Sequence, residues 1–548
     1  MKSLARRCSG CPALLARGLR ARGWEFLILL LCLAFAASAS ARVYNGQPKL
    51  VVIVIIDQFR GDYLERAHDQ FGPSGFRLLT DRGAYFTNCN YDYATTETAP
   101  GHATLLTGAY TNGHGILGND WWDPATRRMI TSVDDAATKM LPDGGVGASP
   151  RLLLADTLGD EMKLATQGKS RVFAVSLKAR AAVLPGGFAA DAAYWIEGYS
   201  GHWQSSTFYM SALPAWVQQF NAGNPAQKYW NREWKDANGG TLGRTTKGER
   251  SAFYDVVGAT PFANDYELDF ARQLIAQEKL GQGPTTDLLV VSLSANDILG
   301  HEAGPDSPQV EAMALALDRQ LSDFFSFLGQ QLGLANVWIA LSADHGVSPV
   351  PAAANKFRIP AQVVNAGAIR KQVNAALTAK FSPGKPADYV RVLGLSRAFL
   401  NEDAFAAVHV SEADAERAAG EALVQAGMRG YFTRAQLARG EVPPDALGRQ
   451  FLHSYSPYGG WYVLALPPPY TFPLWPGALT THGSPYAYDT HVPLAFFGLA
   501  FQPGVYRGHC EPVDMVATLA SLLGINAPNH AHGHVLTDAV RPSGGSTQ

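Results

Sequence analysis

Cysteine is scarce in this sequence, which has five cysteines in 548 residues. Three of them, Cys8, Cys11 and Cys32, fall within the first 41 residues, which leaves Cys89 and Cys510 in the rest of the chain. Two cysteines cannot form the disulfide framework of a small secreted scaffold, so that class of protein is excluded. The two can pair in an oxidising compartment, but their positions in the sequence leave open whether they meet.

An excess of charge of either sign is also missing, since 45 lysines and arginines nearly balance 47 aspartates and glutamates. The formal net charge of −2 provides no basic field for nucleic acid, so no nucleic-acid-binding surface is expected. The sequence shows no internal repeat, no EF-hand loop and no amphipathic element suited to a dimer. A monomer is therefore the default expectation, and a further calcium or magnesium site stays open.

The apolar run near the N-terminus, residues 26–36, is too short to span a membrane comfortably as a permanent helix. Arginines precede it and the small residues Ala39-Ser40-Ala41 follow it, which is the pattern of a secretory signal. We expect residues 1–41 to be a signal peptide and residues 42–548 to be a periplasmic or secreted protein without a stable membrane anchor. A retained N-terminal anchor is the alternative.

Continuous β-branched runs recur along the chain, which is typical of strands buried on both faces of a parallel sheet. They lie at residues 49–56, 171–177, 287–293 and 336–341. Helical patterns at residues 264–279 and 309–332 separate or follow them, and a closing helix is expected at 512–523 with Pro512 in its first position. The alternation predicts an α/β fold with a doubly wound, mostly parallel sheet flanked by helices.

Two stretches interrupt this alternation. Residues 200–263 are rich in Trp, Tyr, Gly and Asn, and residues 351–480 have helix and strand signals of their own. Long connections in compact domains are often functional, so both are interpreted as insertions that cap a site. The alternative is that they only cover sheet edges.

Acidic residues follow three of the predicted strands. Asp57 comes after the first, Asp297 after the third and Asp344 after the fourth. Ligands of doubly wound sheets bind outside the carboxyl ends of the strands, so these carboxylates are expected to converge at one edge. A single aspartate there is usually a turn former. Three that converge repel one another unless a cation neutralises them, which predicts a metal site.

Histidines supply the remaining candidate ligands. His301 follows Asp297 by four residues, which places both on the same face of a helix. His345 is adjacent to Asp344, and His482 lies in the loop Thr480-Thr481-His482-Gly483. Carboxylate and imidazole ligands together favour zinc, and catalytic zinc keeps a coordination position open for substrate.

The candidate nucleophile is Thr98. Pro100 favours the first turn of a helix, so Thr98 is expected at the helix N-terminus, where backbone N–H groups and the helix dipole favour anions. A threonine hydroxyl is a weak nucleophile, but coordination to zinc can convert it to an alkoxide at ordinary pH. A structural N-cap threonine is compatible with the same position.

Taken in chain order, these residues resemble the alkaline phosphatase superfamily, from about residue 49 to about residue 523. The motifs are Asp57, Thr98 in Thr-x-Pro-x-His, Asp297 with His301, Asp344-His345-Gly346 and His482-Gly483. The resemblance implies two zinc ions, one held by Asp57, Thr98, Asp344 and His345, the other by Asp297, His301 and His482. Arylsulfatases share this fold but have a cysteine or serine before x-Pro-x-Arg, whereas Thr98 and His102 occupy those places here.

Two further segments narrow the branch of the superfamily. The segment Gly115-Ile116-Leu117-Gly118-Asn119 resembles an asparagine motif that nucleotide pyrophosphatase/phosphodiesterases share with phosphate-irrepressible alkaline phosphatases. Lys178 and Arg180 resemble the Lys-x-Arg pair of those phosphatases, which the diesterases lack. The resemblance implies that Asn119, Lys178 and Arg180 bind phosphoryl oxygens, and additional cations favour doubly charged monoesters. We therefore expect a zinc-dependent phosphomonoester hydrolase that acts on small molecules through a phosphothreonine at Thr98. A phosphodiesterase of the same superfamily is the alternative.

Overall fold

The computed structural model describes residues 47–541 except 250, 395 and 474. The signal peptide expected at residues 1–41 lies outside the described residues. Within the described part of the chain, none of the helices combines the length and the apolar character needed to cross a membrane. The described residues from Pro48 onward belong to one compact unit.

Five parallel strands form the centre of the main sheet. In spatial order they are β13 (Val337–Ser342), β1 (Leu50–Ile56), β12 (Asp287–Leu293), β7 (Val172–Ser176) and β8 (Ala192–Ile196). Every residue of β1 is fully buried, as the continuous apolar runs predicted. The four strands expected from the sequence are β1, β7, β12 and β13, with ends that agree to within one residue.

Further strands extend this sheet on both sides, with antiparallel pairing except between β2 (Ala84–Asn90) and β21 (Gly504–Tyr506). On one side β20 (His491–Phe497) is antiparallel to β13 and to β2, and β21 lies beyond β2. On the other side are β9 (Trp203–Ser206), β5 (Asp134–Leu141) and β6 (Val146–Ala148). The 11-stranded sheet has the order β21-β2-β20-β13-β1-β12-β7-β8-β9-β5-β6.

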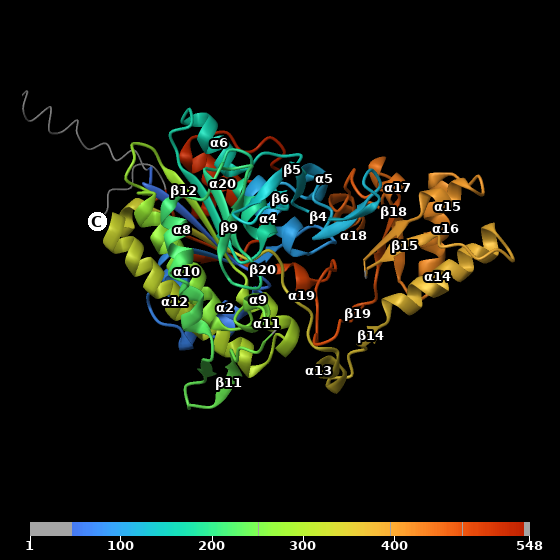
Figure 1. Cartoon of the computed structure of the whole chain (residues 1–548), viewed down its shortest axis with the longest axis horizontal. Helices are drawn as coiled ribbons and strands as arrows, with labels where there is room; N and C mark the ends of the chain where they lie inside the picture. Colours follow the sequence, from blue (N-terminus) through green and yellow to red (C-terminus); the bar gives the residue numbers. More distant parts are fainter. Residues whose placement is uncertain (1–46, 250, 395, 474, 542–548) are drawn as a thin grey trace, which may run out of the picture. The chain divides into compact units, whose positions relative to one another are not determined.

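Helices cover both faces of the sheet (Figure 1). One face is covered by α3 (Phe76–Arg82), α10 (Pro261–Gln277) and α12 (Pro308–Leu332), and the other by α4 (Thr98–Thr107), α6 (Leu158–Ala165), α7 (Ala179–Gly186) and α20 (Asp514–Leu523). β-α-β connections are right-handed in nearly all proteins, so the direction of travel along the sheet decides the face that a helix covers. The expected doubly wound fold is confirmed.

The closing helix α20 begins later than the sequence predicted. Pro512 was expected in its first position, but the helix starts at Asp514, with Val513 as the preceding cap residue. The Asp514 carboxylate accepts a hydrogen bond from the backbone N–H of Glu511 at 2.9 Å. This contact holds residues 511–513 in a turn before the helix, which explains why the proline lies outside it.

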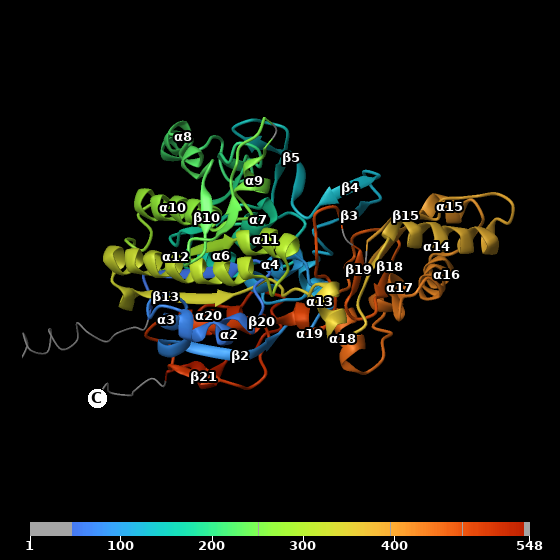
Figure 2. The same ribbon diagram turned by 90° about the horizontal axis from the view of Figure 1, so that it is seen from below.

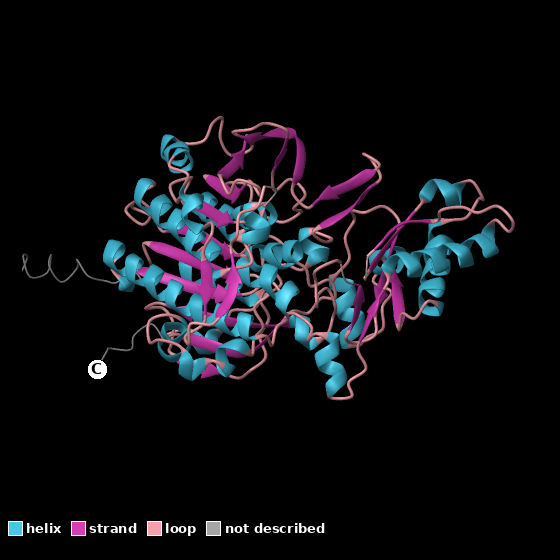
Figure 3. Ribbon diagram, turned by 60° about the horizontal axis from the view of Figure 1, so that its bottom comes forward, coloured by secondary structure: helices cyan, strands magenta, loops and turns pink. Residues whose placement is uncertain are grey.

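The two irregular stretches differ in their organisation. Residues 200–263 include β9 of the main sheet, α8 (Ala215–Ala222), the hairpin of β10 (Glu233–Lys235) and β11 (Thr241–Arg244), and α9 (Phe253–Val256). Residues 351–480 form a second sheet in the order β15-β16-β18-β17, with α14 (Ala366–Phe381) and α16 (Glu412–Gln425) packed beside it (Figure 3). Its strands are Val390–Leu393, Arg397–Leu400, Tyr462–Leu466 and Gly430–Thr433.

Cys89 and Cys510, whose relation the sequence left open, lie side by side in the fold. They form a parallel β-bridge, with the Asn90 N–H donating to the Cys510 carbonyl at 3.0 Å and the Cys510 N–H donating to the Asn88 carbonyl at 3.1 Å. Both are buried free thiols in this structure. The segment that follows β21 thus meets strand β2 of the main sheet at a pair of cysteines.

Candidate active site

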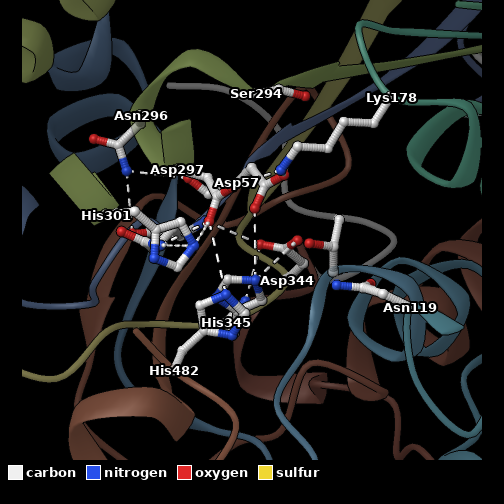
Figure 4. A network of polar contacts seen from close by, with 12 residues as sticks. Asp57, Asn119, Lys178, Ser294, Asn296, Asp297, His301, Asp344, His345 and His482 are labelled. Carbon is white, nitrogen blue, oxygen red and sulfur yellow. Dashed lines mark hydrogen bonds and ion pairs between the residues drawn. The ribbon is translucent and has the colours of Figure 1, made fainter. Parts of the chain in front are cut away.

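Three carboxylates meet at the C-terminal ends of the central strands, as the sequence predicted. Asp57 follows β1, Asp344 follows β13, and Asp297 lies in the first turn of α11 (Ala295–Ala303), the helix that follows β12. All three side chains are buried, and Figure 4 shows them directed toward one another. Burial of like charges this close requires compensation by cations or N–H donors.

The ammonium group of Lys178 provides part of that compensation. Its Nζ lies 2.5 Å from Asp57 Oδ2 and 2.6 Å from Asp297 Oδ2. Burial opposes the charged form, but the carboxylates of Asp297 and Asp57 outweigh it and raise the pKa of Lys178 far above its usual range. The sequence led us to expect this ammonium at the phosphoryl group, whereas in this structure it binds two carboxylates.

The three candidate histidines share one hydrogen-bonding arrangement. In each ring Nδ1 lies within hydrogen-bond distance of a backbone carbonyl: His345 with Gly346 O at 2.9 Å, His301 with Thr480 O at 2.9 Å and His482 with Thr96 O at 2.7 Å. A carbonyl only accepts, so Nδ1 carries the proton and Nε2 presents a lone pair. This tautomer is the one that a metal-ligating imidazole needs.

Two groups of these atoms are close enough to hold a cation. One is Asp297, His301 and His482, and the other is Asp57, Asp297 and His345, with the ligand atoms of each group within 4.8 Å of one another. Among the described residues, Asp57 Oδ1 and His345 Nε2 are buried acceptors without a hydrogen-bond partner. Buried unpaired acceptors are costly, so an incoming cation would satisfy them. The donor set of carboxylate and neutral imidazole fits a zinc-type ion.

The ionisation of the site matches that interpretation. Burial, together with the charges of Asp297 and Asp344, raises the pKa of Asp57. Burial also acts on Asp297, but the charge of Lys178 outweighs it and holds the pKa of Asp297 well below its usual value. Burial lowers the pKa values of His345 and His482, which keeps both rings neutral. Neutral rings beside carboxylates are ready to bind a metal ion without losing a proton first.

Gln58 also belongs to this site, although no sequence motif marked it. Its Nε2 donates to Asp297 Oδ1 at 2.6 Å and lies 3.2 Å from His301 Nε2, and its backbone N–H donates to Asp344 Oδ1 at 3.0 Å. The residue has a φ of 63°, which only a few per cent of non-glycine residues adopt. Such strain is typical of functional sites, and the amide here lies among the acceptors that would hold a cation.

Thr98 is the first residue of α4, as expected, and its side chain is almost fully buried. The helix packs tightly on the metal-site segment, because a Cβ added at Gly101 would lie 2.7 Å from Asp344 Cβ. Asn119 Oδ1 accepts a hydrogen bond from the N–H of Ala99 at 2.8 Å. The side-chain NH2 of Asn119 is therefore oriented away from the helix backbone and is available to a ligand.

His102 ties the nucleophile helix to the central sheet. Its Nδ1 lies 2.8 Å from the carbonyl of Thr98 and 3.2 Å from Asp344 Oδ2, and its Nε2 lies 2.7 Å from the hydroxyl of Ser292 in β12. In the sequence, His102 is part of the Thr-x-Pro-x-His motif and argues against a sulfatase. Its contacts give it a positioning role at the start of α4.

A cavity of about 630 Å³ opens beside these groups. Thr98, Asn119 and Arg180 line it together with Asp297, His301 and His482, whereas Lys178 does not. Residues from both irregular stretches also line it: Tyr254 and Asp255 from the first, and Gly394, Ser396, Arg397, Pro473 and Trp475 from the second. The sequence identified none of these wall residues, because nothing in their local pattern marks them.

Acceptor groups beside a buried hydroxyl at a helix N-terminus are typical of enzymes that cleave phosphoesters. Comparison with known proteins narrows this class. Residues 51–425 match the family described as Type I phosphodiesterase / nucleotide pyrophosphatase. A Myroides odoratus protein named calcium-transporting ATPase is 34% identical over 94% of this chain and 98% of its own length. The alkaline phosphatase PhoV of Synechococcus elongatus is 31% identical over 94% of this chain and 100% of its length.

The fold agrees with a solved relative. The crystal structure of the alkaline phosphatase PafA is 29% identical in sequence and superposes with a TM-score of 0.80, covering 90% of this chain and 99% of that one. The chain belongs to the type I phosphodiesterase/nucleotide pyrophosphatase family, in the alkaline phosphatase superfamily. It is an enzyme of the alkaline phosphatase type, a phosphoester hydrolase, as the sequence resemblance implied.

Proposed function

We propose that the protein is a zinc-dependent phosphomonoester hydrolase that releases inorganic phosphate through a phosphothreonine at Thr98. The observation that carries the proposal is the shared cavity, in which Thr98, Asn119 and Arg180 line the same space as Asp297, His301 and His482. A nucleophile, phosphoryl-binding donors and metal ligands are thus available to one bound molecule.

Two zinc ions are proposed as cofactors. Asp57, Thr98, Asp344 and His345 would hold one, and Asp297, His301 and His482 the other. Bound zinc supplies positive charge that lowers the pKa of a coordinated hydroxyl or water and stabilises the leaving oxygen. The protonated Nδ1 of each histidine fixes the ring orientation and tautomer for this purpose.

The chain's own residues bind and orient the phosphoryl group. The Thr98 oxygen attacks phosphorus at the N-terminus of α4, where backbone N–H groups and the helix dipole favour the anion, while the P–O bond to the leaving group breaks. The proton of the hydroxyl is released to water, and the departing oxygen takes up a proton and leaves as the alcohol. Asn119, held by the Ala99 N–H, donates its NH2 to one phosphoryl oxygen, and Arg180 donates to another. The transition state is loose, so positioning and charge supply most of the catalysis. Water then hydrolyses the Thr98 ester and restores the hydroxyl.

A monoester is preferred over a diester in this proposal because its transferred group has an additional negative charge. Arg180 in the cavity wall supports this preference directly. Lys178 supports it less directly, since its ammonium contacts Asp57 and Asp297 and has to reorient to reach a substrate. A phosphodiesterase of the same superfamily remains the second candidate, because the matched family description includes that activity.

We also propose that residues 1–41 are a signal peptide and that residues 42–548 form the catalytic domain, with cap insertions at about 200–263 and about 351–480. The enzyme is proposed to work in the periplasm or outside the cell. It is proposed to act as a monomer on small-molecule phosphomonoesters. The cavity wall supplied by both stretches supports a cap role.

The test compares hydrolysis of 4-nitrophenyl phosphate, its bis-ester and ATP at alkaline pH, with zinc and after chelation. Thr98→Ala is the test variant, and Thr107→Ala, at the other end of the same helix and outside the cavity wall, is the matched control. We expect zinc-dependent preference for the monoester, lost in the Thr98 variant alone. Preference for the bis-ester would favour the diesterase, and undiminished activity of Thr98→Ala would rule out this nucleophile.

A further inference from the structure

Arg397, from the 351–480 stretch, lines the same cavity as Thr98 and Asn119. Arg397 begins β16, which lies between β15 and β18 in the small sheet, and only 8% of its surface is exposed. A charged side chain buried this far from bulk water requires strong partners, and its partners belong to the catalytic segments.

Those partners lie in two separate segments of the main domain. One guanidinium nitrogen of Arg397 donates to the carboxylate of Glu97, the residue directly before Thr98, and the other donates to the carbonyl of Leu117 at 2.5 Å. The start of α4 and the loop that precedes Asn119 are thereby bridged by one planar group. Two-pronged contacts of this kind are specific to arginine.

Glu97 transmits the contact to Asn119. Its second carboxylate oxygen accepts a hydrogen bond from the backbone N–H of Asn119 at 3.0 Å, and the Asn119 side chain returns to α4 through the Ala99 N–H. Arg397, Glu97, Asn119 and Ala99 form a closed chain of contacts around the N-terminus of α4. This chain fixes the backbone and the side chain of the amide that is expected to bind phosphate.

The close approach of Arg397 depends on a glycine. A Cβ added at Gly118 would lie 2.6 Å from both Cζ and Nη1 of Arg397, so the guanidinium lies flat against the backbone of residue 118. Beyond it, the Ser456 hydroxyl donates to the Gly115 carbonyl at 2.7 Å, and the rings of Trp121 and Tyr458 stack with centroids 5.8 Å apart. Figure 2 shows the hairpin of β3 (Asp120–Asp123) and β4 (Arg128–Thr131) extending toward the small sheet.

We propose that Arg397 is a positioning residue of the active site: it holds Glu97 and Asn119 in register with Thr98 and neutralises the Glu97 carboxylate beside the phosphoryl group. The proposal rests on the proposed phosphomonoesterase function. It has two separable parts. Loss of the bridge misplaces Asn119, which slows hydrolysis of every ester. Loss of the positive charge leaves Glu97 uncompensated in the cavity wall, which repels a dianionic monoester more than a monoanionic diester.

The experiment measures kcat and KM for 4-nitrophenyl phosphate and for its bis-ester in four full-length variants. Arg397→Ala should lower kcat/KM for the monoester by about 10- to 100-fold, because small misplacements of catalytic groups have effects of this size, and it should lower the monoester/diester ratio. Arg397→Lys keeps the charge without the bridge, so it should lose rate but retain the ratio. The double variant Arg397→Ala/Glu97→Gln should recover the ratio, since the uncompensated charge is gone.

The matched control is Arg434→Ala. Arg434 belongs to the same stretch and forms an ion pair with Glu412, but it does not line the Thr98 cavity. We expect it to leave the ratio and the rates unchanged. Zinc content should be equal in all variants, because Arg397 contacts none of the proposed metal ligands. Thermal unfolding checks that each variant folds, and Gly118→Ala, which displaces the guanidinium, replaces Arg397→Ala if that variant does not.

The proposal would be overturned if Arg397→Ala had the same monoester/diester ratio as wild type. It would also be overturned if the double variant Arg397→Ala/Glu97→Gln did not restore that ratio. If the wild type hydrolyses neither ester, the proposed function fails, and the same variants are compared by calorimetric binding of inorganic phosphate. Weaker binding by Arg397→Ala, restored in the double variant, would then support the role of Arg397, and unchanged binding would refute it.

Discussion

Gly101 occupies the closest contact between the nucleophile helix and the metal-site segment, so Gly101→Ala is a sharp test of the site geometry. A Cβ at this position would lie 2.7 Å from Asp344 Cβ and 2.8 Å from the Asp344 carbonyl carbon. Carbon atoms in contact lie about 3.5–4.0 Å apart. The helix or the Asp344 segment therefore has to move by about 1 Å to accommodate the methyl group, and both carry groups of the proposed active site.

Two energies of opposite sign act on this variant. Overpacking of a tight core costs about 1–3 kcal/mol, whereas replacing a helical glycine by alanine contributes about 1 kcal/mol of stability. The net effect on the free energy of unfolding is therefore small to moderate. The effect on catalysis is larger, because a displacement of about 1 Å between nucleophile and metal ligands can reduce the rate by about 100-fold. We expect a folded protein with greatly reduced kcat.

Gly329→Ala is the matched control for this prediction. Gly329 also lies inside a helix, α12, but a Cβ there would be 3.8 Å from its nearest neighbour, an ordinary contact. We expect this variant to be slightly more stable than wild type and fully active. The measurements are denaturant unfolding and turnover of 4-nitrophenyl phosphate at saturating zinc. If Gly101→Ala matched Gly329→Ala in both, the close packing of α4 on Asp344 would be refuted.

Three other predictions follow from buried groups. Lys178→Ala should lower the melting temperature more after chelation than with zinc, because the Lys178 ammonium and a zinc ion can each compensate the charges of Asp57 and Asp297. Equal decreases in melting temperature under the two conditions would contradict this. Burial raises the pKa of Glu416 to about 7 from 4.5, so its contribution to stability is complete below pH 4.5 and is lost as pH rises through 7. Glu416→Gln should therefore be more stable than wild type at pH 9, by up to about 3 kcal/mol, but not at pH 4, in urea titrations. Oxidised glutathione should link Cys89 to Cys510 and add about 2–4 kcal/mol to the free energy of unfolding, a gain that Cys510→Ser abolishes. Mass spectrometry without reduction should identify the linked peptides. Two thiols that stay titratable in the unfolded protein after this treatment would contradict the prediction.

The main sheet was predictable because its strands have an unambiguous pattern. A strand such as β1 is buried on both faces, so every residue is apolar and the run stands out from its surroundings. The carboxylates follow from the same pattern, since each one lies within four residues of the end of a clear apolar run. The start of α20 was not predictable in the same way, because Asp514 binds the backbone of Glu511 and shifts the helix start past Pro512.

The contacts of some site residues could not be predicted from the sequence, because they depend on the tertiary fold. Gln58 enters the site through a left-handed backbone conformation that glutamine rarely adopts, so no propensity argument would place it there. Lys178 was assigned to the phosphoryl group from its motif, whereas its ammonium lies between Asp57 and Asp297. A motif specifies which residue reaches a site, and the pairwise distances decide which atoms it contacts.

The N-terminus of α4 is held from two sides, and this arrangement explains why a distant part of the chain bears on catalysis. On one side Gly101 allows the helix to contact the Asp344 segment, and on the other Gly118 allows Arg397 to reach Glu97. Each contact depends on the absence of a side chain, so neither can be read from the chemical character of a residue. A variant at Gly101 should disturb the distance between Thr98 and the metal ligands, and a variant at Arg397 the distance between Thr98 and Asn119. The two effects should therefore be separable. The Gly101 variant should lower both the zinc content and kcat, whereas the Arg397 variant should lower the monoester/diester ratio while its zinc content stays full.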